Sequence, residues 1–282
     1  MVENRPWLTL LAHLVLIAGV VLVMFPVYLA FIASTRGPND FMSGVMPLLP
    51  GPHMVENYTS MFTAGMSTSG APPIGPMMLN SLIMAVGVAV GKIAISIISA
   101  YAIVYFKFPF RVLSFWLIFI TLMLPVEVRI VPTFNIVANL GMLNSYGGLI
   151  IPIIASATAT FLFRQFFLTV PEELMEAARV DGAGPIKFFF DILLPLSVTN
   201  IAALFIILFV LGWNQYLWPM LVTTDQHFYT VVMGIKRMAD TADAVPHWNT
   251  VMAAVIMAAL PPVLIIVAMQ RLFVKGLVET EK

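Results

Sequence analysis

The chain has 282 residues, of which 60% are hydrophobic and 10% are charged, and its 14 basic and 14 acidic residues cancel. A soluble domain does not need so much apolar sequence, so the composition indicates an integral membrane protein. The zero net charge argues against a nucleic-acid partner. The absence of cysteine excludes a disulfide framework and thiolate chemistry, and the four histidines show no metal-ligand spacing.

A helix that crosses a lipid bilayer needs about 20 apolar residues, and segments of this kind recur along the whole chain. In chain order they are Leu8–Ala33, Met77–Phe106, Leu113–Val126, Leu149–Leu168, Val198–Val222 and Val251–Val267. The first is too long for a signal-peptide core and no cleavage pattern follows it, so we expect it to be retained. The sequence therefore predicts an all-α membrane protein with six transmembrane helices.

Basic residues favour the cytoplasmic side of a membrane, so their distribution predicts the orientation. With the N-terminus inside, the inner side carries Arg5, Lys107, Arg111, Arg164, Arg179, Lys187, Arg271, Lys275 and Lys282, whereas the outer side carries Arg36, Arg129, Lys236 and Arg237. Both termini are therefore predicted to be cytoplasmic.

The same pattern divides the chain into an N-terminal transmembrane helix (1–35), a periplasmic loop (36–76), a five-helix core (77–275) and a cytoplasmic tail (276–282). Residues 36–76 are rich in Pro, Gly, Met and Ser, the composition of an irregular connection. The outer stretch Thr223–Asn249 has room for short helices that meet an external partner, although a solvated loop is the favoured interpretation.

The core contains one polar cytoplasmic loop, residues 169–195, which predicts a helix–turn–helix. Thr169 and Glu172 have the spacing of a capping box, good helix formers follow as far as Arg179, and Gly182 is suited to ending the helix. A second short helix is expected from Pro185 to Ile192, with Pro195 ending the unit. The first helix would carry a charged stripe of Glu172, Glu176 and Arg179 beside a small apolar surface of Leu174, Ala177 and Ala178.

Several polar residues lie within or beside the predicted spans and are candidates for a translocation path. Lys92 is predicted near the bilayer midplane, where a cation costs about 2.5–3.5 kcal/mol unless it faces protein or water. It is either an anion contact or a structural, buried or snorkelling lysine. Glu127 and Arg129 follow the third span and suit either an outer mouth or an interfacial anchor. The remaining candidates are Trp213, Asn214, Gln215 and Tyr216, which also suit an aromatic belt and helix-packing amides.

Gly87 to Lys92 looks superficially like a phosphate loop, but it is one residue short and lies inside a hydrophobic span. Gly87 and Gly91 are better interpreted as a small-residue face for helix packing. The chain shows no nucleophile–base or metal-protease motif, so it is not expected to be an enzyme.

The cytoplasmic loop carries a longer pattern as well. Glu176-Ala177-Ala178 is followed after three residues by Gly182, and after nine more by Ile192 with Leu194-Pro195. This pattern resembles the signature of the permease subunits of ABC importers. Met123–Pro125, Trp213-Asn214 and the tail Gln270–Leu277 resemble the carbohydrate-uptake branch of that family, which includes the second maltose permease. Thr121–Ile130, Ser156–Phe167 and Gly212–Pro219 resemble more closely the permeases of sn-glycerol-3-phosphate importers.

The resemblance implies the type I ABC importer permease fold in a bacterial inner membrane, with a sister permease forming a heterodimer, two ATP-binding subunits and a periplasmic substrate-binding protein. It assigns the coupling to the ATPase to Glu172, Glu176, Ala177, Ala178, Arg179, Asp181, Gly182, Ile192 and Pro195. No cofactor is expected in this chain, because ATP and Mg would be bound by the partner ATPase.

The substrate implied by the resemblance is sn-glycerol 3-phosphate or a glycerophosphodiester, and the alternative is a neutral sugar or oligosaccharide. A secondary transporter driven by an ion gradient would need an internal repeat, matching broken helices and intramembrane carboxylates, and the sequence shows no such set.

Overall fold

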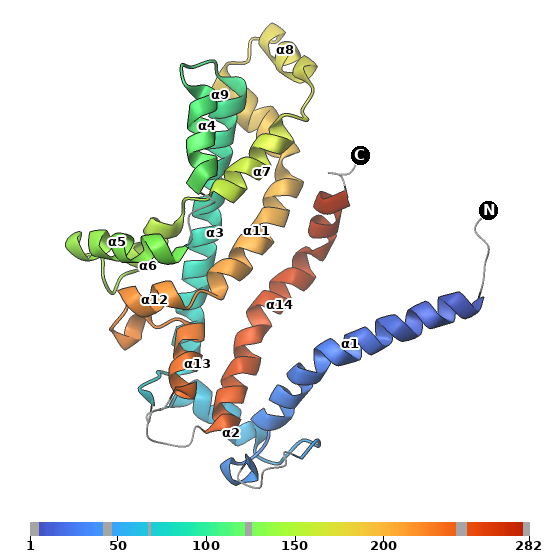
Figure 1. Cartoon of the computed structure of the whole chain (residues 1–282), viewed down its shortest axis with the longest axis vertical. Coiled ribbons are helices and arrows are strands. Elements are labelled where there is room, and N and C mark those ends of the chain that lie inside the picture. Colours follow the sequence, from blue (N-terminus) through green and yellow to red (C-terminus); the bar gives the residue numbers. More distant parts are fainter. Residues whose placement is uncertain (1–5, 42–46, 67–68, 122–125, 241–246, 279–282) are drawn as a thin grey trace. The chain divides into compact units, whose positions relative to one another are not determined.

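The computed structural model describes residues 6–41, 47–66, 69–121, 126–240 and 247–278, without the side chains of residues 6, 126, 127 and 271–278. In these ranges the regular backbone is helical apart from one isolated bridge between Met66 and Ala71. The α-helices, labelled in Figure 1 except for α10, are α1 (Pro6–Ser34), α2 (Met54–Thr63), α3 (Ile74–Tyr105), α4 (Arg111–Ile120), α5 (Val126–Asn139), α6 (Tyr146–Ile150), α7 (Ala157–Phe167), α8 (Glu172–Val180), α9 (Pro185–Phe188), α10 (Leu194–Leu196), α11 (Val198–Trp213), α12 (Leu217–Val222), α13 (Val231–Ala239) and α14 (Trp248–Val278).

Three helices are long and apolar enough to cross a membrane, at Trp7–Ser34, Ile74–Tyr105 and Trp248–Gln270. They correspond to the first, second and sixth predicted spans. Two helix pairs also qualify if each pair is counted as one span, although one is bent by 50° and the other by 70°. The third predicted span contains α4, which has 10 residues and is too short to cross alone. The described residues therefore provide three to five spans.

The fourth and fifth predicted spans were expected to be continuous, and the structure corrects both. The fourth is interrupted between Ile153 and Ala157, because Ser156 adopts an extended conformation and its Oγ accepts a hydrogen bond from the Ala159 N–H, which starts a new helix. The fifth ends at Trp213, and α12 starts at Leu217. Pro219 cannot continue a helix from the preceding turn, since it lacks an N–H and its ring crowds the carbonyl four residues earlier.

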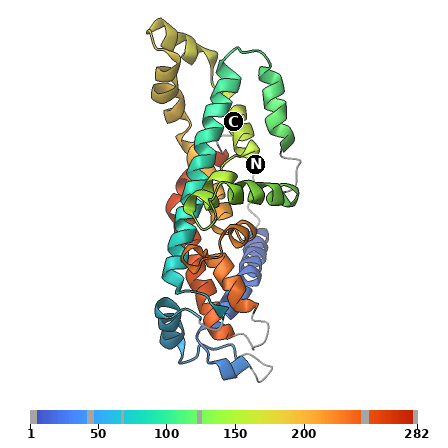
Figure 2. The same ribbon diagram turned by 90° about the vertical axis from the view of Figure 1, so that its left-hand side faces the viewer.

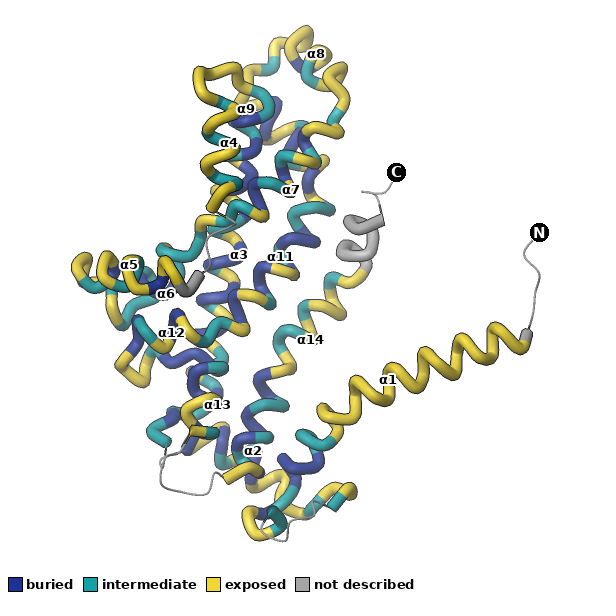
Figure 3. The backbone as a smooth tube through the Cα atoms, in the orientation of Figure 1, coloured by how far each residue is buried: buried dark blue, intermediate teal, exposed yellow. Residues whose placement is uncertain are grey.

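The chain forms two compact units, residues 1–75 with 234–259, and residues 76–233 with 260–282. In the first unit, α1 is exposed along most of its length (Figure 3), and 6% of its most apolar window is buried. The loop at 36–76 was expected to be irregular, but it contains α2. The buried Asn57 of α2 donates to the carbonyls of Ser34 and Arg36, both at 2.9 Å, and accepts from Asn249 at 2.8 Å.

The second unit contains all the candidate site residues, and α3 runs along it (Figure 2). One cluster of buried side chains joins α3, α5, α6 and α12, and comprises Met84, Val88, Ile130, Val137, Leu149, Trp218 and Val222. The Trp218 indole Nε1–H donates to the Gly148 carbonyl at 3.2 Å, so this large ring is fixed by a hydrogen bond as well as by packing.

Small residues let other segments approach α3 closely. A Cβ added to Gly87 would lie 2.7 Å from the Ile150 Cδ1 atom, and one added to Gly91 would lie 2.6 Å from the Ile154 Cγ2 atom. The predicted small-residue face is therefore confirmed. Because lipid gives helices no hydrophobic reason to associate, close approach of this kind is a main source of cohesion in a membrane protein.

Replacing Gly212 by valine is expected to destabilise the second unit by about 1–3 kcal/mol, the usual cost of overpacking. A Cβ on Gly212 would lie 3.0 Å from the Ala85 Cα and 3.4 Å from the Ala85 carbonyl oxygen, so backbone would have to move. Gly19→Val is the control, since nothing lies within 4 Å of its added Cβ. Thermal unfolding of the purified complex in detergent measures the difference, and equal melting temperatures would contradict this packing.

Candidate functional site

The cytoplasmic loop folds as a helix–turn–helix. Helix α8 spans Glu172–Val180. It is terminated by Gly182, whose φ of 75° lies in the left-handed region. The Ala183 N–H donates to the Ala178 carbonyl at 2.8 Å and the Gly182 N–H donates to the Arg179 carbonyl at 3.1 Å. These two bonds form a Schellman motif. The predicted helix is confirmed, and so is the prediction that Gly182 ends it.

The predicted capping box at the start of α8 is wrong. Pro171 is the N-cap residue and provides no side-chain cap, while the Thr169 hydroxyl donates to the Phe166 carbonyl at 2.7 Å and so closes the last turn of α7. A hydroxyl bonded to the preceding helix is not available to the next one. Glu172 and Glu173 still stabilise the start of α8, because carboxylates interact favourably with the positive end of a helix dipole.

The second half of the loop also differs from the prediction, since Pro195 does not end it. A π-helical turn at Phe189–Leu193 follows α9, and the short α10 (Leu194–Leu196) contains Pro195 in its first turn. A proline is tolerated there because the first N–H groups of a helix have no intrahelical partner. Ile192 lies within the π-turn and is partly buried.

The exposure of α8 shows which side of the helix is free. Glu172, Glu176, Ala177 and Arg179 are exposed, as are Asp181, Gly182 and Pro195. Ala178 is 5% exposed, so it belongs to the interior of the loop and its predicted place on a docking surface is corrected. Successive helical residues are turned by about 100°. Glu176 and the buried Ala178 therefore lie on opposite sides of α8.

An aromatic joint fastens this loop to the end of α3. The Tyr101 hydroxyl donates to the Pro185 carbonyl at 2.8 Å, and the Tyr101 ring lies 5.0 Å from that of Phe189. The Tyr105 ring lies 5.4 Å from Phe188 and 6.1 Å from Phe167. The joint therefore connects α3, α7 and the π-turn, and Figure 1 shows α9 at this end of α3.

Two of the predicted path residues come together. Lys92 of α3 and Arg129 of α5 line one cavity of about 500 Å³, together with Ile95, Ser99, Ile118, Thr121 and residues 155–158 and 160. The Ser96 hydroxyl donates to the Ser156 carbonyl at 3.1 Å, which ties the start of α7 to α3 beside this cavity. Among the described lining residues none is acidic. The side chain of Glu127 lies outside the described residues.

The other predicted path residues do not line this cavity. Trp213 is 2% exposed, and its ring stacks on that of Phe209 with centroids 5.8 Å apart. It is therefore a core residue, and its interpretation as part of an interfacial aromatic belt is wrong. Asn214, Gln215 and Tyr216 form the break between α11 and α12, so the two amides are not inside a continuous span. Asn214 is exposed.

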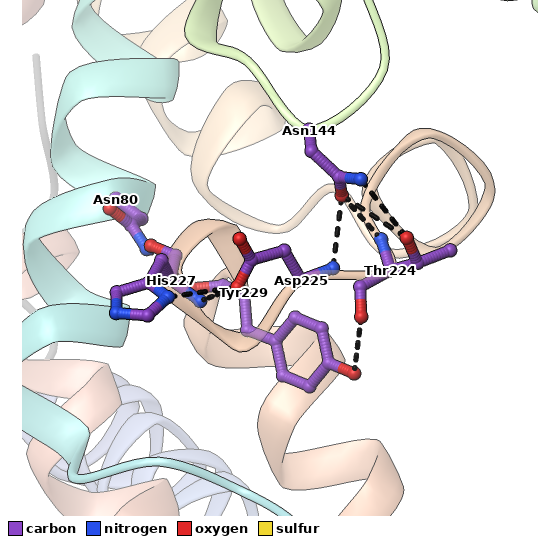
Figure 4. Close-up of polar contacts among 6 residues, drawn as sticks. All are labelled: Asn80, Asn144, Thr224, Asp225, His227 and Tyr229. Atoms are coloured by element: carbon purple, nitrogen blue, oxygen red, sulfur yellow. Dashed lines mark hydrogen bonds and ion pairs between the residues drawn. The ribbon is translucent and has the colours of Figure 1, made fainter.

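Sequence reasoning missed a polar network in the second unit (Figure 4). Asn80 of α3 donates to the carbonyls of His227 and Tyr229 at 2.7 and 3.0 Å. It also accepts from the Tyr146 hydroxyl at 2.7 Å. The Asn144 side-chain oxygen, Oδ1, accepts from the backbone N–H groups of Thr224 and Asp225 at 2.7 and 2.9 Å. These bonds hold a short 3-10 turn at Gln226–Phe228 where a solvated loop was favoured.

The exposed end of this network is a contact between Asp225 and His227. The His227 backbone N–H donates to Asp225, and the His227 ring contacts the same carboxylate at 2.9 Å. These contacts hold the pKa of the Asp225 carboxyl below its usual value. Because the pKa of Asp225 is lower in the folded protein, its contacts with His227 stabilise the fold at pH values above the ordinary carboxyl pKa. This stabilisation is lost as the pH falls through the lowered pKa.

Comparison with known proteins identifies the family of this chain. Residues 92–279 match the model of the family described as binding-protein-dependent transport system inner membrane component. The chain belongs to that family. The matched range contains the cytoplasmic loop, the aromatic joint and both cations of the cavity. Secondary transporters also contain broken helices. Because the chain belongs to this family, its two bent helix pairs are not evidence for a secondary transporter.

Curated relatives match over the full length. The permease protein UgpE of the sn-glycerol-3-phosphate transport system from Agrobacterium fabrum is 56% identical, with 100% of both chains covered. The proteins of the same name from Escherichia coli O1:K1 and Yersinia pestis are 55% and 56% identical over the same length. A crystal structure of a bacterial ABC transporter that imports the acidic polysaccharide alginate has a TM-score of 0.81 at 18% identity, covering 96% of this chain and 98% of that one. It supports the permease fold.

Proposed function

We propose that this chain is the permease subunit of an ATP-driven importer for sn-glycerol 3-phosphate or glycerophosphodiesters. The observation that carries the proposal is the 56% identity, over all 282 residues, to a permease named for the sn-glycerol-3-phosphate transport system. Its partners would be a sister permease, two ATPase subunits that bind ATP and Mg, and a periplasmic substrate-binding protein. Six spans and two cytoplasmic termini, with the domain limits given above, complete the proposal.

The exposed side of α8 would dock on an ATPase subunit, through Glu172, Glu176, Ala177 and Arg179. Its charges would fix the orientation of the contact, since complementary charges set register and partner choice. The turn at Asp181-Gly182, with Ile192 and Pro195 behind it, would hold α8 in position. Closure of the ATPase pair would then move the loop as a body, and the aromatic joint would pass the movement to α3.

Reconstitution of the complete importer in lipid tests the proposal. With the binding protein present, we expect sn-glycerol 3-phosphate to stimulate ATP hydrolysis and maltose to leave it unchanged. Stimulation by maltose alone would retain the importer and replace its substrate by a neutral sugar. ATP hydrolysis that responds to neither compound, in a complex that binds the loaded binding protein, would contradict the proposed substrate class.

Replacing Tyr101 by phenylalanine is expected to lower the number of substrate molecules transported per ATP about threefold to fivefold. The change removes the 2.8 Å hydrogen bond to Pro185 but keeps the ring contacts, and a neutral hydrogen bond contributes about 1 kcal/mol. Tyr105→Phe is the matched control, because its hydroxyl is 3.5 Å from the Phe167 carbonyl and its bond is correspondingly weak. An equal effect of both variants would contradict the role of the Tyr101 bond.

A further inference from the structure

We propose that the cavity lined by Lys92 and Arg129 is a phosphate subsite, at which this subunit itself contacts the anionic end of the transported substrate. The inference rests on the proposed function and deepens it, because none of the comparisons assigns a substrate contact to this chain. It follows from the charge of the cavity, its depth, the groups opposite the two cations and the rigidity of its walls.

The charge of the cavity calls for an anion. Lys92 and Arg129 both line it, and within the described residues neither has an ion-pair partner and no acidic side chain shares the lining. Like charges that line one cavity repel, and Lys92, which is partly buried, also costs desolvation energy, whereas Arg129 is exposed. The attraction of a dianion such as a phosphate monoester offsets both costs, whereas a neutral sugar offsets neither.

The depth of the cavity favours a substrate over a lipid. Lys92 lies 13 residues before Tyr105, the last residue of α3, which places it roughly 20 Å from that end at 1.5 Å per residue. The headgroup phosphates of a bilayer lie at its surfaces, outside a hydrocarbon core about 30 Å thick. A phosphate that reaches Lys92 near the middle of the span has therefore entered from an aqueous path.

Groups opposite the cations add to the site. The first turn of α7 contributes Ser156, Ala157, Thr158 and Thr160 to the lining. The hydroxyls of Ser99, Thr121 and Thr160 already donate to backbone carbonyls at 2.7, 2.7 and 2.9 Å. The hydroxyl donors that remain are Thr158 and Ser156, whose Oγ accepts from the Ala159 N–H. The start of α7 also presents the positive end of its helix dipole, which supplements the two side-chain charges.

The walls of the cavity are held in place by the packing of α3 on the break between η4 (Ile151–Ile153) and α7. Gly91 packs so closely against Ile154 that a Cβ would lie 2.6 Å from its Cγ2 atom, and the Ser96 hydroxyl donates to the Ser156 carbonyl. A wall that is already fixed lowers the cost of ordering on binding. The volume, about 500 Å³, lies within the usual range for small-molecule sites.

Direct binding to the ATPase-associated permease complex, without the binding protein, tests the subsite. The complex is placed in nanodiscs of phosphatidylcholine and titrated with radiolabelled sn-glycerol 3-phosphate, with inorganic phosphate and maltose as competitors. We expect saturable binding that phosphate displaces and maltose does not. Lys92→Met and Arg129→Met are each expected to raise the Kd about tenfold, the effect of losing one charge-assisted hydrogen bond.

Lys92→Arg keeps the charge and is expected to retain most of the binding, which separates loss of charge from misfolding. Lys107→Met removes an exposed cation outside this cavity and should leave the Kd unchanged. Failure of the parent complex to bind, or equal binding by parent and Lys92→Met, would overturn the subsite. Displacement of the ligand by phosphatidylglycerol in the nanodisc would also overturn it, by assigning the cavity to a lipid headgroup.

The outcome is separable from that of the proposed function. Transport of sn-glycerol 3-phosphate by the complete importer, with Lys92→Met as active as the parent, would remove the subsite and leave the proposed function intact. Binding of inorganic phosphate that depends on Lys92, in an importer that sn-glycerol 3-phosphate does not stimulate, would keep the subsite and replace the substrate by another phosphate compound.

Discussion

Replacing Glu176 by lysine is expected to lower uptake by the assembled importer about 100-fold, because a reversed charge in a protein–protein contact costs several kcal/mol. Glu176 is exposed on the side of α8 opposite the buried Ala178, and no ion pair within the described residues engages it. The subunit should therefore fold and assemble normally, since surface substitutions usually change stability by less than about 0.5 kcal/mol.

Asp191→Lys is the matched control for this prediction. It makes the same change in charge at another exposed position of the cytoplasmic loop, in the π-turn and outside α8. We expect uptake within about threefold of the parent for this variant, since exposed charges away from a contact have small effects. ATP-driven uptake of radiolabelled sn-glycerol 3-phosphate into proteoliposomes measures both. Normal uptake by Glu176→Lys, or equal losses in the two variants, would contradict the docking role.

Replacing Gly182 by valine is expected to lower uptake about tenfold or more. Gly182 has a φ of 75°, and an L residue in the left-handed region costs about 1–2 kcal/mol, with a further cost for a β-branched side chain. The Schellman bonds that end α8 depend on this conformation. The variant should therefore lose the native direction of the chain between α8 and α9, and with it the coupling of the loop to ATP hydrolysis.

Gly184→Val isolates the backbone effect. Neither Gly182 nor Gly184 has a heavy atom within 4 Å of an added Cβ, so the two substitutions are equal in contacts. They differ in backbone, since Gly184 has φ −73° and ψ 170° before Pro185, a conformation that valine adopts readily. We expect uptake close to the parent for Gly184→Val. Equal losses in the two variants would show that bulk, and not the left-handed turn, is responsible.

The sequence predicted α1, α3 and the apolar part of α14 well because each is a long apolar run that folds as one unbroken helix. The breaks inside the fourth and fifth predicted spans were missed because apolar residues flank both of them. What ends the helices there is local, a Ser156 cap and the position of Pro219, and such signals are weak beside the apolar run that surrounds them. Pattern reading therefore finds a span more reliably than its interruptions.

The candidate site was predictable to a similar extent. The family signature located the cytoplasmic loop, and a charge inside a predicted span singled out Lys92. The cavity itself could not be predicted, because only the fold shows that Lys92 and Arg129 line the same space. The Asn80 network was out of reach, since its hydrogen bonds join residues 147 and 149 positions apart. Thr169 shows the opposite kind of error, a contact that the sequence predicted and the structure does not contain. Its spacing to Glu172 suited a cap, yet its hydroxyl had a nearer carbonyl in the preceding turn.

One unbroken helix, α3, carries both Lys92 and the aromatic joint at Tyr101, and this has a consequence for how the chain can change during evolution. Inserting or deleting a single residue between them would shift one relative to the other by about 1.5 Å along the axis but turn it by about 100° around the axis. Such a change would swing Lys92 out of the cavity or Tyr101 away from Pro185. Length variation should therefore be absent from residues 92–101, while the loop at 36–76 should tolerate it.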